Sequence, residues 1–167
     1  MSQIRTQTSQ VYFSSLKILH IALLMGQILF AGVSYFLHQS GDLQFNMEEL
    51  VPILKILVPV LIIGASLGSQ FVFKFKIREA ISKENLSAKL VGYRIALVLQ
   101  CAILEGASLF SIVSYLLTAD MWFLAMAAIV IVLFVLQAPN QQKVAMALQL
   151  NNQEKQILEK PDNVVIQ

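Results

Sequence analysis

Residues 95–117 read IALVLQCAILEGASLFSIVSYLL, and this stretch decides which kind of fold the chain can adopt. It is longer than the roughly 20 apolar residues that an α-helix needs to cross about 30 Å of hydrocarbon, and its one charged residue is Glu105. Three further apolar stretches lie at about 18–37, 52–73 and 121–137. Backbone groups in lipid must be paired within their own segment, so all four are expected to be helices. The sequence predicts an all-α membrane protein with four transmembrane helices.

Composition supports the same fold class. The 167 residues are 57% hydrophobic and 13% charged, with a mean hydropathy of +0.69. A soluble domain carries about a quarter charged residues, because most of its surface faces water. The net charge of +2 is small and scattered, so nucleic acid is not expected as a partner, whereas the lipid bilayer is. A single cysteine excludes an intrachain disulfide.

The distribution of basic residues predicts the orientation, because short cytoplasmic loops carry the excess of lysine and arginine. Residues 74–94 hold six basic residues and two acidic ones, whereas residues 38–50 hold three acidic residues and no lysine or arginine. Arg5 and Lys17 precede the first helix, and Lys143 follows the fourth. We therefore expect a multi-pass protein of the plasma (inner) membrane with both termini in the cytoplasm.

Two regions follow from this topology. Residues 1–137 form the predicted four-helix transmembrane domain, with a helical cytoplasmic hairpin between its second and third helices, and residues 138–167 form a cytoplasmic tail. The tail is expected to be one weakly amphipathic helix from 141 to about 160, which Pro161 ends. A cleaved signal peptide is the alternative at the N-terminus. It is disfavoured because the apolar run is too long and begins only after a polar stretch through Ser15.

Catalytic signatures are missing from the sequence. No stretch matches a phosphate-binding loop, a dinucleotide fingerprint, a zinc-protease box or a nucleophile elbow. The histidines, His20 and His38, are separated by about 27 Å along one helix at 1.5 Å per residue, so they cannot share a metal ion. We therefore expect no enzyme, no catalytic residue, no bound metal and no cofactor.

Glu105 is the strongest candidate for a functional residue. It follows Arg94 by eleven residues, which places it about 16 Å into the membrane, near the midplane. An ionised side chain there costs roughly 3 kcal/mol or more, whereas protonating a glutamate at pH 7 costs about 3.7 kcal/mol. Glu105 is therefore expected to lie inside the helix bundle, neutral or titrating near physiological pH.

Two further residues join Glu105 in the predicted ion- or proton-binding site. Gln27 lies at a similar depth on the first helix and could donate a hydrogen bond to Glu105, and Ser108 lies one turn away on the same helix. A hydrogen-bonded Glu105 could equally hold the bundle together without binding an ion. The sequence leaves both roles open.

Small residues predict where helices pack closely. Gly64 and Gly68 form a GxxxG pattern on the second helix, and Gly106 follows Glu105 on the third. Glycines at this spacing let two membrane helices approach each other closely. The stretch from Trp122 to Leu136 lacks polar residues, so the fourth helix is expected to face lipid over much of its surface.

Lys55 is the one basic residue that falls inside a predicted transmembrane stretch away from the basic segments. It lies about one turn from the outer end of the second helix. A lysine at this depth can extend its ammonium group toward the membrane surface. Its expected partner is one of Glu48, Glu49 and Asp120.

The nine residues Ala102–Phe110, AILEGASLF, resemble the second helix of rotary ATPase proteolipid subunits. In that family a midmembrane acid carries the translocated proton or sodium ion, so the resemblance implies this role for Glu105. The hairpin of the second and third predicted helices, with its basic cytoplasmic loop and the small residues on its first helix, is also similar, so the resemblance spans about 55 of the 167 residues. The family's dense glycine repeat is reduced here to Gly64 and Gly68, and its Arg-Gln/Asn-Pro turn is missing.

These patterns predict a non-enzymatic membrane protein that assembles with itself or with a larger membrane complex through its small-residue faces. The alternative is a proton- or ion-coupled carrier or channel subunit that uses Glu105. Neither the transported ion nor the partner can be read from the residues.

Overall fold

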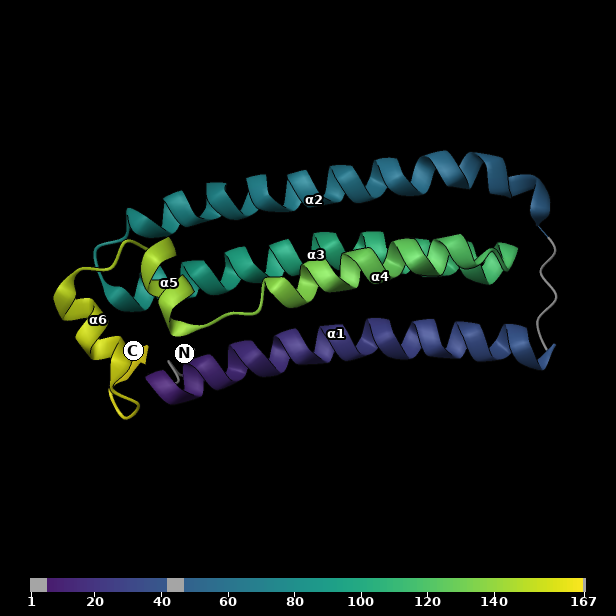
Figure 1. The fold of residues 1–167 in the computed structure, drawn as a ribbon. Helices are drawn as coiled ribbons and strands as arrows, with labels where there is room; N and C mark the ends of the chain where they lie inside the picture. Colours follow the sequence, from purple (N-terminus) through teal and green to yellow (C-terminus); the bar gives the residue numbers. More distant parts are fainter. Residues whose placement is uncertain (1–5, 42–46, 167) are drawn as a thin grey trace, which may run out of the picture. The chain divides into compact units, whose positions relative to one another are not determined.

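The computed structural model describes residues 6–41 and 47–166, and nearly all of them are helical (Figure 1). The elements are β1 (Gln7–Thr8), α1 (Ser9–Ser40), the 3-10 turn η1 (Glu48–Leu50), α2 (Val51–Ile81), α3 (Leu86–Thr118), α4 (Met121–Leu136), α5 (Gln141–Ala147), α6 (Asn152–Glu159) and β2 (Val164–Ile166). The predicted all-α class is confirmed. Arg5 and Asp42, which contributed to the predicted orientation, lie outside the described residues.

Among the described residues, three helices, α1, α2 and α3, are long and apolar enough to cross a membrane. A fourth span is reached if α4 and the bent continuation α5 are counted together. All three long helices extend beyond the predicted apolar stretches. The connection between α2 and α3 is short, and Asn85 Oδ1 accepts the backbone N–H of Ala88 at 3.0 Å to begin α3. The expected helical hairpin is therefore present.

The chain divides into two compact units. The first, here called the terminal unit, contains Met1–His20, Gln70–Gln100 and Ala138–Gln167. The second, the apolar unit, contains Ile21–Ser69 and Cys101–Gln137.

Lysine and arginine are distributed very unequally between the two units. Among the described residues, Lys55 is the one lysine or arginine of the apolar unit, and all the others belong to the terminal unit. The three segments that the sequence predicted for one side of the membrane thus fold together.

Both ends of the described chain meet in the terminal unit. β1 pairs antiparallel with β2, with Gln7 opposite Ile166. At the start of α1, Ser9 Oγ donates to the carbonyl oxygen of Leu158 at 2.5 Å, and the hydroxyl of Tyr12 donates to the carbonyl oxygen of Leu90 at 2.7 Å. The N-terminal segment is therefore attached to the tail and to α3. This strand pair was not predicted, because two- and three-residue strands leave no periodicity in the sequence.

The tail forms two short helices, so the prediction of a single helix from 141 to about 160 is wrong. The chain turns at Gln149, which has a φ of 51°. Asn151 then starts α6 through a capping box: its side chain accepts the N–H of Glu154, and the Glu154 carboxylate accepts the N–H of Asn151. These two bonds satisfy backbone groups that would otherwise lack partners, which favours a new helix start. As expected, α6 ends before Pro161.

Glu154 also connects the tail to α3. Its carboxylate lies 2.6 Å from the Nζ of Lys89, and the two side chains are only 13% and 14% exposed. Burial raises the pKa of Glu154, but the hydrogen bonds from Lys89 and from the Asn151 N–H outweigh it and hold the pKa below its usual range. The ion pair therefore stabilises the docked tail while Glu154 is ionised.

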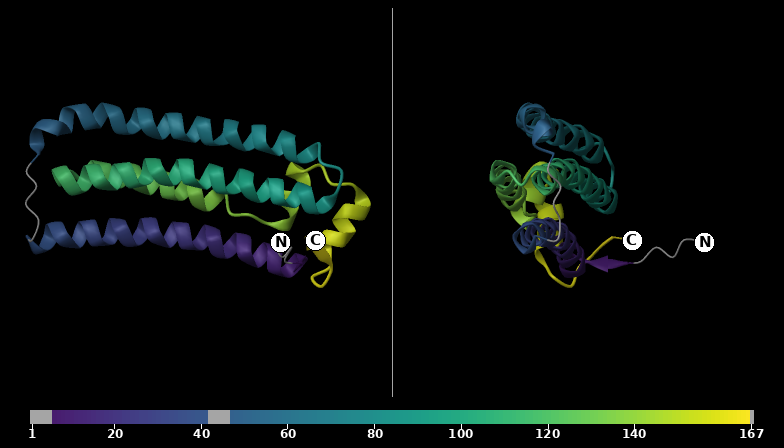
Figure 2. Two further views of the ribbon diagram at one scale, coloured as in Figure 1. Left: turned by 180° about the vertical axis from the view of Figure 1, so that it is seen from behind. Right: turned by 90° about the vertical axis from the view of Figure 1, so that its right-hand side faces the viewer.

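Within the apolar unit, α4 lies beside α3 and runs in the opposite direction (Figure 2). Ser111 Oγ on α3 donates to the carbonyl oxygen of Phe123 on α4 at 2.7 Å. One face of α4 is buried and consists of Phe123, Ala127, Val130 and Phe134. This spacing of three to four residues is that of a helix side packed against a neighbour. The opposite side, including Val132 and Leu136, is exposed, so the lipid-facing prediction applies to part of α4 only.

The turn between α3 and α4 contains the ion pair that the sequence anticipated. Lys55 Nζ lies 2.8 Å from the Oδ2 of Asp120, which was one of its three expected partners. The Asp120 carboxylate also accepts the N–H of Trp122 at 3.0 Å and caps α4. The hydrogen bond from Lys55 and then that from Trp122 hold the pKa of Asp120 below its usual range, against the opposing effect of burial.

Replacing the tail's acidic partner tests its docking. We expect Glu154→Gln to lower the stability at pH 6 by about 1 kcal/mol, because the bond to Lys89 loses its charge. The folded-state pKa of Glu154 lies below its unfolded value of about 4.3, so its contribution is complete above that pH and is lost as the pH falls through the folded value. Thermal unfolding of the detergent-solubilised protein should therefore show the difference between wild type and Glu154→Gln shrinking as the pH falls below about 4.3.

Glu79→Gln is the matched control, because it breaks the more exposed pair with Lys76. It should change the melting temperature much less. An unfolding difference between wild type and Glu154→Gln that stays constant from pH 6 to pH 3 would contradict the assigned ion pair.

Candidate functional site: a polar band on α1 and α3

A hydrogen bond near the ends of α1 and α3 sets the register of these helices in the apolar unit. The Nε2 of His38 lies 2.8 Å from the carbonyl oxygen of Leu116, so the ring donates to it. The two helices run in the same direction (Figure 1). A residue that precedes His38 on α1 and a residue that precedes Leu116 on α3 by the same number of positions therefore lie at the same level along the helix axes, because each residue advances a helix by 1.5 Å. Eleven residues back, about 16 Å away, these positions are Gln27 and Glu105.

Gln27 projects from α1 on the same side as His38. Eleven residues equal three turns plus about 20°, so the two side chains leave α1 in nearly the same direction, toward α3. Gln27 is fully buried. Its Nε2 donates to the carbonyl oxygen of Leu23 at 3.4 Å, whereas its Oε1 has no hydrogen-bond partner among the described residues. An acceptor is thus available inside the apolar unit at the level of Glu105.

Glu105 is half-buried at the edge of the buried side of α3. Ser108 follows it by one turn and is fully buried, and its Oγ has no partner in the described chain. Within that part of the structure, no hydrogen bond joins Glu105 to Gln27 or to Ser108. The expected direct bond from Gln27 is therefore not formed in the single chain. Whether the three residues act as one site stays a prediction.

Buried polar residues continue along both helices beyond this level. Ser34 lies seven residues after Gln27 on the same side of α1, and its Oγ also lacks a partner among the described residues. On α3, Thr118 Oγ1 donates to the carbonyl oxygen of Ser114 at 2.7 Å, so that hydroxyl is satisfied by its own helix. We call Gln27, Ser34, Glu105 and Ser108 the polar band. Sequence reasoning missed Ser34, although the seven-residue spacing of His20, Gln27 and Ser34 marks one side of a helix.

The polar band offers oxygen atoms that can exchange hydrogen bonds with a proton carrier or with water. A buried polar atom without a partner costs about 1–3 kcal/mol, and native proteins satisfy such atoms with water or with a ligand. Gln27 Oε1 can accept from a protonated carboxyl, and the serine hydroxyls can both donate and accept. The described residues contain no group of three or more histidine, cysteine, aspartate or glutamate side chains that could hold a metal ion.

The glycines predicted to pack helices have open space beside them among the described residues. At Gly64, Gly68 and Gly106, an added Cβ would meet no atom of the described residues within 4 Å. Close approach occurs instead at Gly92 in the terminal unit, where an added Cβ would lie 2.6 Å from the Cβ of Ala80. Gly92 was not singled out in the sequence because it belongs to no GxxxG pattern. The packing role of the other three glycines stays a prediction.

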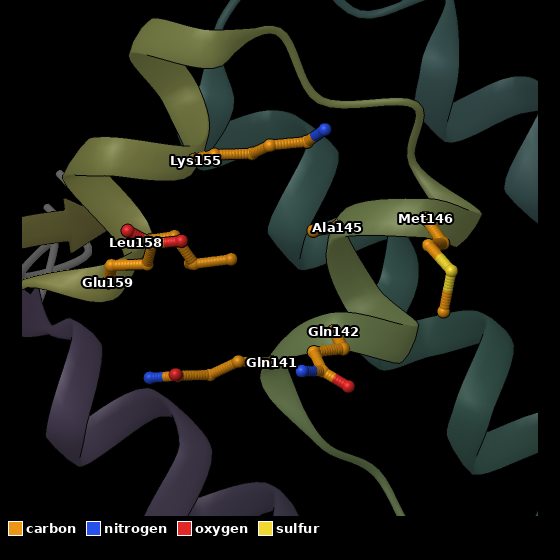
Figure 3. A pocket seen from close by; sticks show the side chains of 7 residues that line it. All are labelled: Gln141, Gln142, Ala145, Met146, Lys155, Leu158 and Glu159. Atoms are coloured by element: carbon orange, nitrogen blue, oxygen red, sulfur yellow. The ribbon is translucent and has the colours of Figure 1, made fainter.

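The terminal unit also contains a cavity of about 380 Å³ between α5 and α6 (Figure 3). The lining residues are Gln141, Gln142, Ala145, Met146, Lys155, Leu158 and Glu159. None of the predicted site residues lines it. Its polar groups come from two short helices, with Lys155 and Glu159 on α6 and two glutamines on α5.

Comparisons with protein-family models, with curated proteins and with solved structures find no match for this chain. The fold places the protein among all-helical chains with three or four helices able to span a membrane.

Two serines of the apolar unit provide a matched test of the polar band. Ser111→Ala removes the bond to the Phe123 carbonyl and should destabilise the protein by about 1 kcal/mol. Ser34→Ala removes a buried hydroxyl that has no partner among the described residues, so no hydrogen bond is lost. The melting temperature of this variant should therefore equal or exceed that of the wild type. Thermal unfolding in one detergent compares both. Equal losses of stability would show that Ser34 has a partner after all.

Proposed function

We propose that this chain is a non-enzymatic integral protein of the plasma (inner) membrane that assembles with a second copy of itself through α2. Both termini and the connection between α2 and α3 face the cytoplasm in this proposal. The observation that carries it is the open GxxxG pattern of Gly64 and Gly68 on α2.

The charge distribution supports the proposed orientation. The terminal unit gathers the N-terminal segment, the connection from α2 to α3 and the tail, and with them every described lysine and arginine except Lys55. Basic segments next to membrane helices favour the cytoplasmic side. An even number of crossings would place both ends of the chain on that side.

The cost of glycine in a helix supports the assembly. A glycine destabilises a helix by about 0.5–1 kcal/mol relative to alanine. Gly64 and Gly68 gain no close contact in the described chain that would offset this cost. In lipid, exposed apolar surface does not drive helices together, but small residues that allow close backbone approach do favour association.

The surroundings of the two glycines favour a second copy as the partner. Only 11% of the most apolar part of α2 is buried within the chain, compared with 50% for α3. Leu57, Leu61 and Phe71 lie along the same side of α2 as Gly64 and are exposed. A two-fold axis would bring this side against itself, so one self-complementary surface would suffice for a dimer.

Substitution of the two glycines tests the dimer. We expect Gly64→Leu with Gly68→Leu to weaken self-association in lipid at least tenfold, about 1.4 kcal/mol, because the larger side chains keep the two backbones apart. Energy transfer between labelled copies, measured at increasing dilution in bilayers, gives the association constant. Gly32→Leu on α1 is the control, since an added Cβ at Gly32 also meets no described atom within 4 Å.

If the wild type remains monomeric at every dilution, the proposed dimer is wrong. If the double variant associates with the same constant as the wild type, the interface between the two copies does not involve Gly64 and Gly68. If the chain is recovered from membranes only together with a different membrane protein, assembly with a larger membrane complex would be favoured over the dimer.

The second candidate function is that of a proton- or ion-coupled carrier or channel subunit. The observation that favours it is the common level of Gln27 and Glu105, which follows from the bond between His38 and Leu116. In this function Glu105 holds the proton, the Oε1 of Gln27 accepts from the protonated carboxyl, and Ser108 completes the polar surroundings. Intramembrane acids commonly serve in such relays. A single chain of this size offers a narrow pathway, so the function would require assembly.

Glu105→Gln separates the two functions, because it preserves size and hydrogen bonding while removing titration. If Glu105 carries protons, proteoliposomes with this variant should lose proton flux while self-association remains. Glu79→Gln serves as the control, since Glu79 lies outside the polar band. Flux that is equal in wild type and Glu105→Gln would exclude the carrier role, and so would a wild type without flux.

A further inference from the structure

Two adjoining grooves in the terminal unit surround Lys17 near the start of α1. One measures about 330 Å³ and is lined by Gln10, Phe13, Ser14, Lys17, Gln141 and Pro161. The other measures about 360 Å³ and is lined by Phe13, Lys17, Asn140, Gln141 and Gln142. Phe13, Lys17 and Gln141 are common to both, so the two form one surface, here called the Lys17 groove.

The chemistry of the Lys17 groove suits an anion. Its lining contains one cation, several amides and a hydroxyl, and none of the lining residues is acidic. Lys143 follows the groove residues on α5, but its Nζ donates to the carbonyl oxygen of Ala138 at 2.9 Å and it does not line the groove. Lysine ammonium groups bind phosphate as point charges, and amide and hydroxyl groups add hydrogen bonds to its oxygens.

The position of the Lys17 groove in the chain suits the surface of a membrane. Lys17 is the last charged residue before the apolar stretch that begins at Ile18. On the other side of the groove, Asn140 and Gln141 follow directly after the apolar helix α4 and the residues that end it. The points at which two apolar segments become polar thus meet at one place. In a membrane protein this is the level of the lipid headgroups.

We propose that the Lys17 groove binds the phosphodiester headgroup of an anionic phospholipid from the cytoplasmic leaflet. The phosphate lies against Lys17 and the amides of Asn140 and Gln141. The buried ring of Phe13, one turn before Lys17 on α1, forms an apolar wall of the groove. Charge complementarity selects an anionic lipid over a zwitterionic one, and the apolar segments that adjoin the groove select a lipid over free phosphate. The proposal assumes that the chain spans a membrane, as proposed above.

The test uses the full chain in detergent, titrated with phosphatidylglycerol, phosphatidylcholine or inorganic phosphate and examined by native mass spectrometry. We expect the wild type to retain phosphatidylglycerol in preference to the other two. Lys17→Gln should weaken this binding about fivefold, about 1 kcal/mol, because one basic residue near an anionic surface contributes roughly that amount. Lys83→Gln, which changes the net charge equally on an exposed residue outside the groove, should bind as the wild type does.

Equal weakening by Lys17→Gln and Lys83→Gln would reduce the effect to net charge and overturn the assigned site. Binding of inorganic phosphate as tight as that of phosphatidylglycerol would overturn the lipid as its ligand. The same spectra report the number of copies of the chain, so a failure of the lipid site is distinguished from a failure of the proposed dimer.

Discussion

The pairing of α1 with α3 is the constraint on which the rest of the structure depends. In the terminal unit the Tyr12 hydroxyl bonds to the carbonyl of Leu90, and in the apolar unit His38 bonds to the carbonyl of Leu116. Both bonds join residues 78 positions apart. In each unit, one aromatic side chain of α1 thus specifies the register between the parts of α1 and α3 that belong to that unit. Leu90 lies inside α3, where a helix carbonyl has a second lone pair for the bond from Tyr12, whereas Leu116 lies in the last turn, where carbonyl oxygens have no partner in their own helix.

This register has consequences for function in both units. In the apolar unit it brings the buried amide of Gln27 to the level of Glu105, which is the basis for the carrier hypothesis. In the terminal unit, the start of α1 contacts the tail through Ser9 and Leu158 and contributes Lys17 to the groove beside Asn140. The carrier hypothesis and the proposed lipid site thus both depend on the position of α1 beside its neighbours in each unit.

The predictions from sequence succeeded where one local property decides the outcome. Apolar length identified the helices that are long and apolar enough to cross a membrane, and the reach of a lysine predicted the pair between Lys55 and Asp120. They failed where several weak local signals compete. The tail breaks into two helices because the capping box of Asn151 and Glu154 outweighs a weak amphipathic pattern. The glycine pattern of α2 could be seen in the sequence. The sequence did not reveal that no described atom lies within 4 Å of a Cβ added at either glycine.

The sequence by itself determined the fold class, because apolar length, charge distribution and the need to pair backbone groups in lipid leave few alternatives. It also identified Glu105, since a charged residue within such a stretch is conspicuous. Only the tertiary structure decided which residues share the level of Glu105, which glycine meets another helix, and that Lys17 lies beside Asn140. These are contacts between distant segments, and they depend on helix register and rotation, which a few hydrogen bonds specify and no local periodicity encodes.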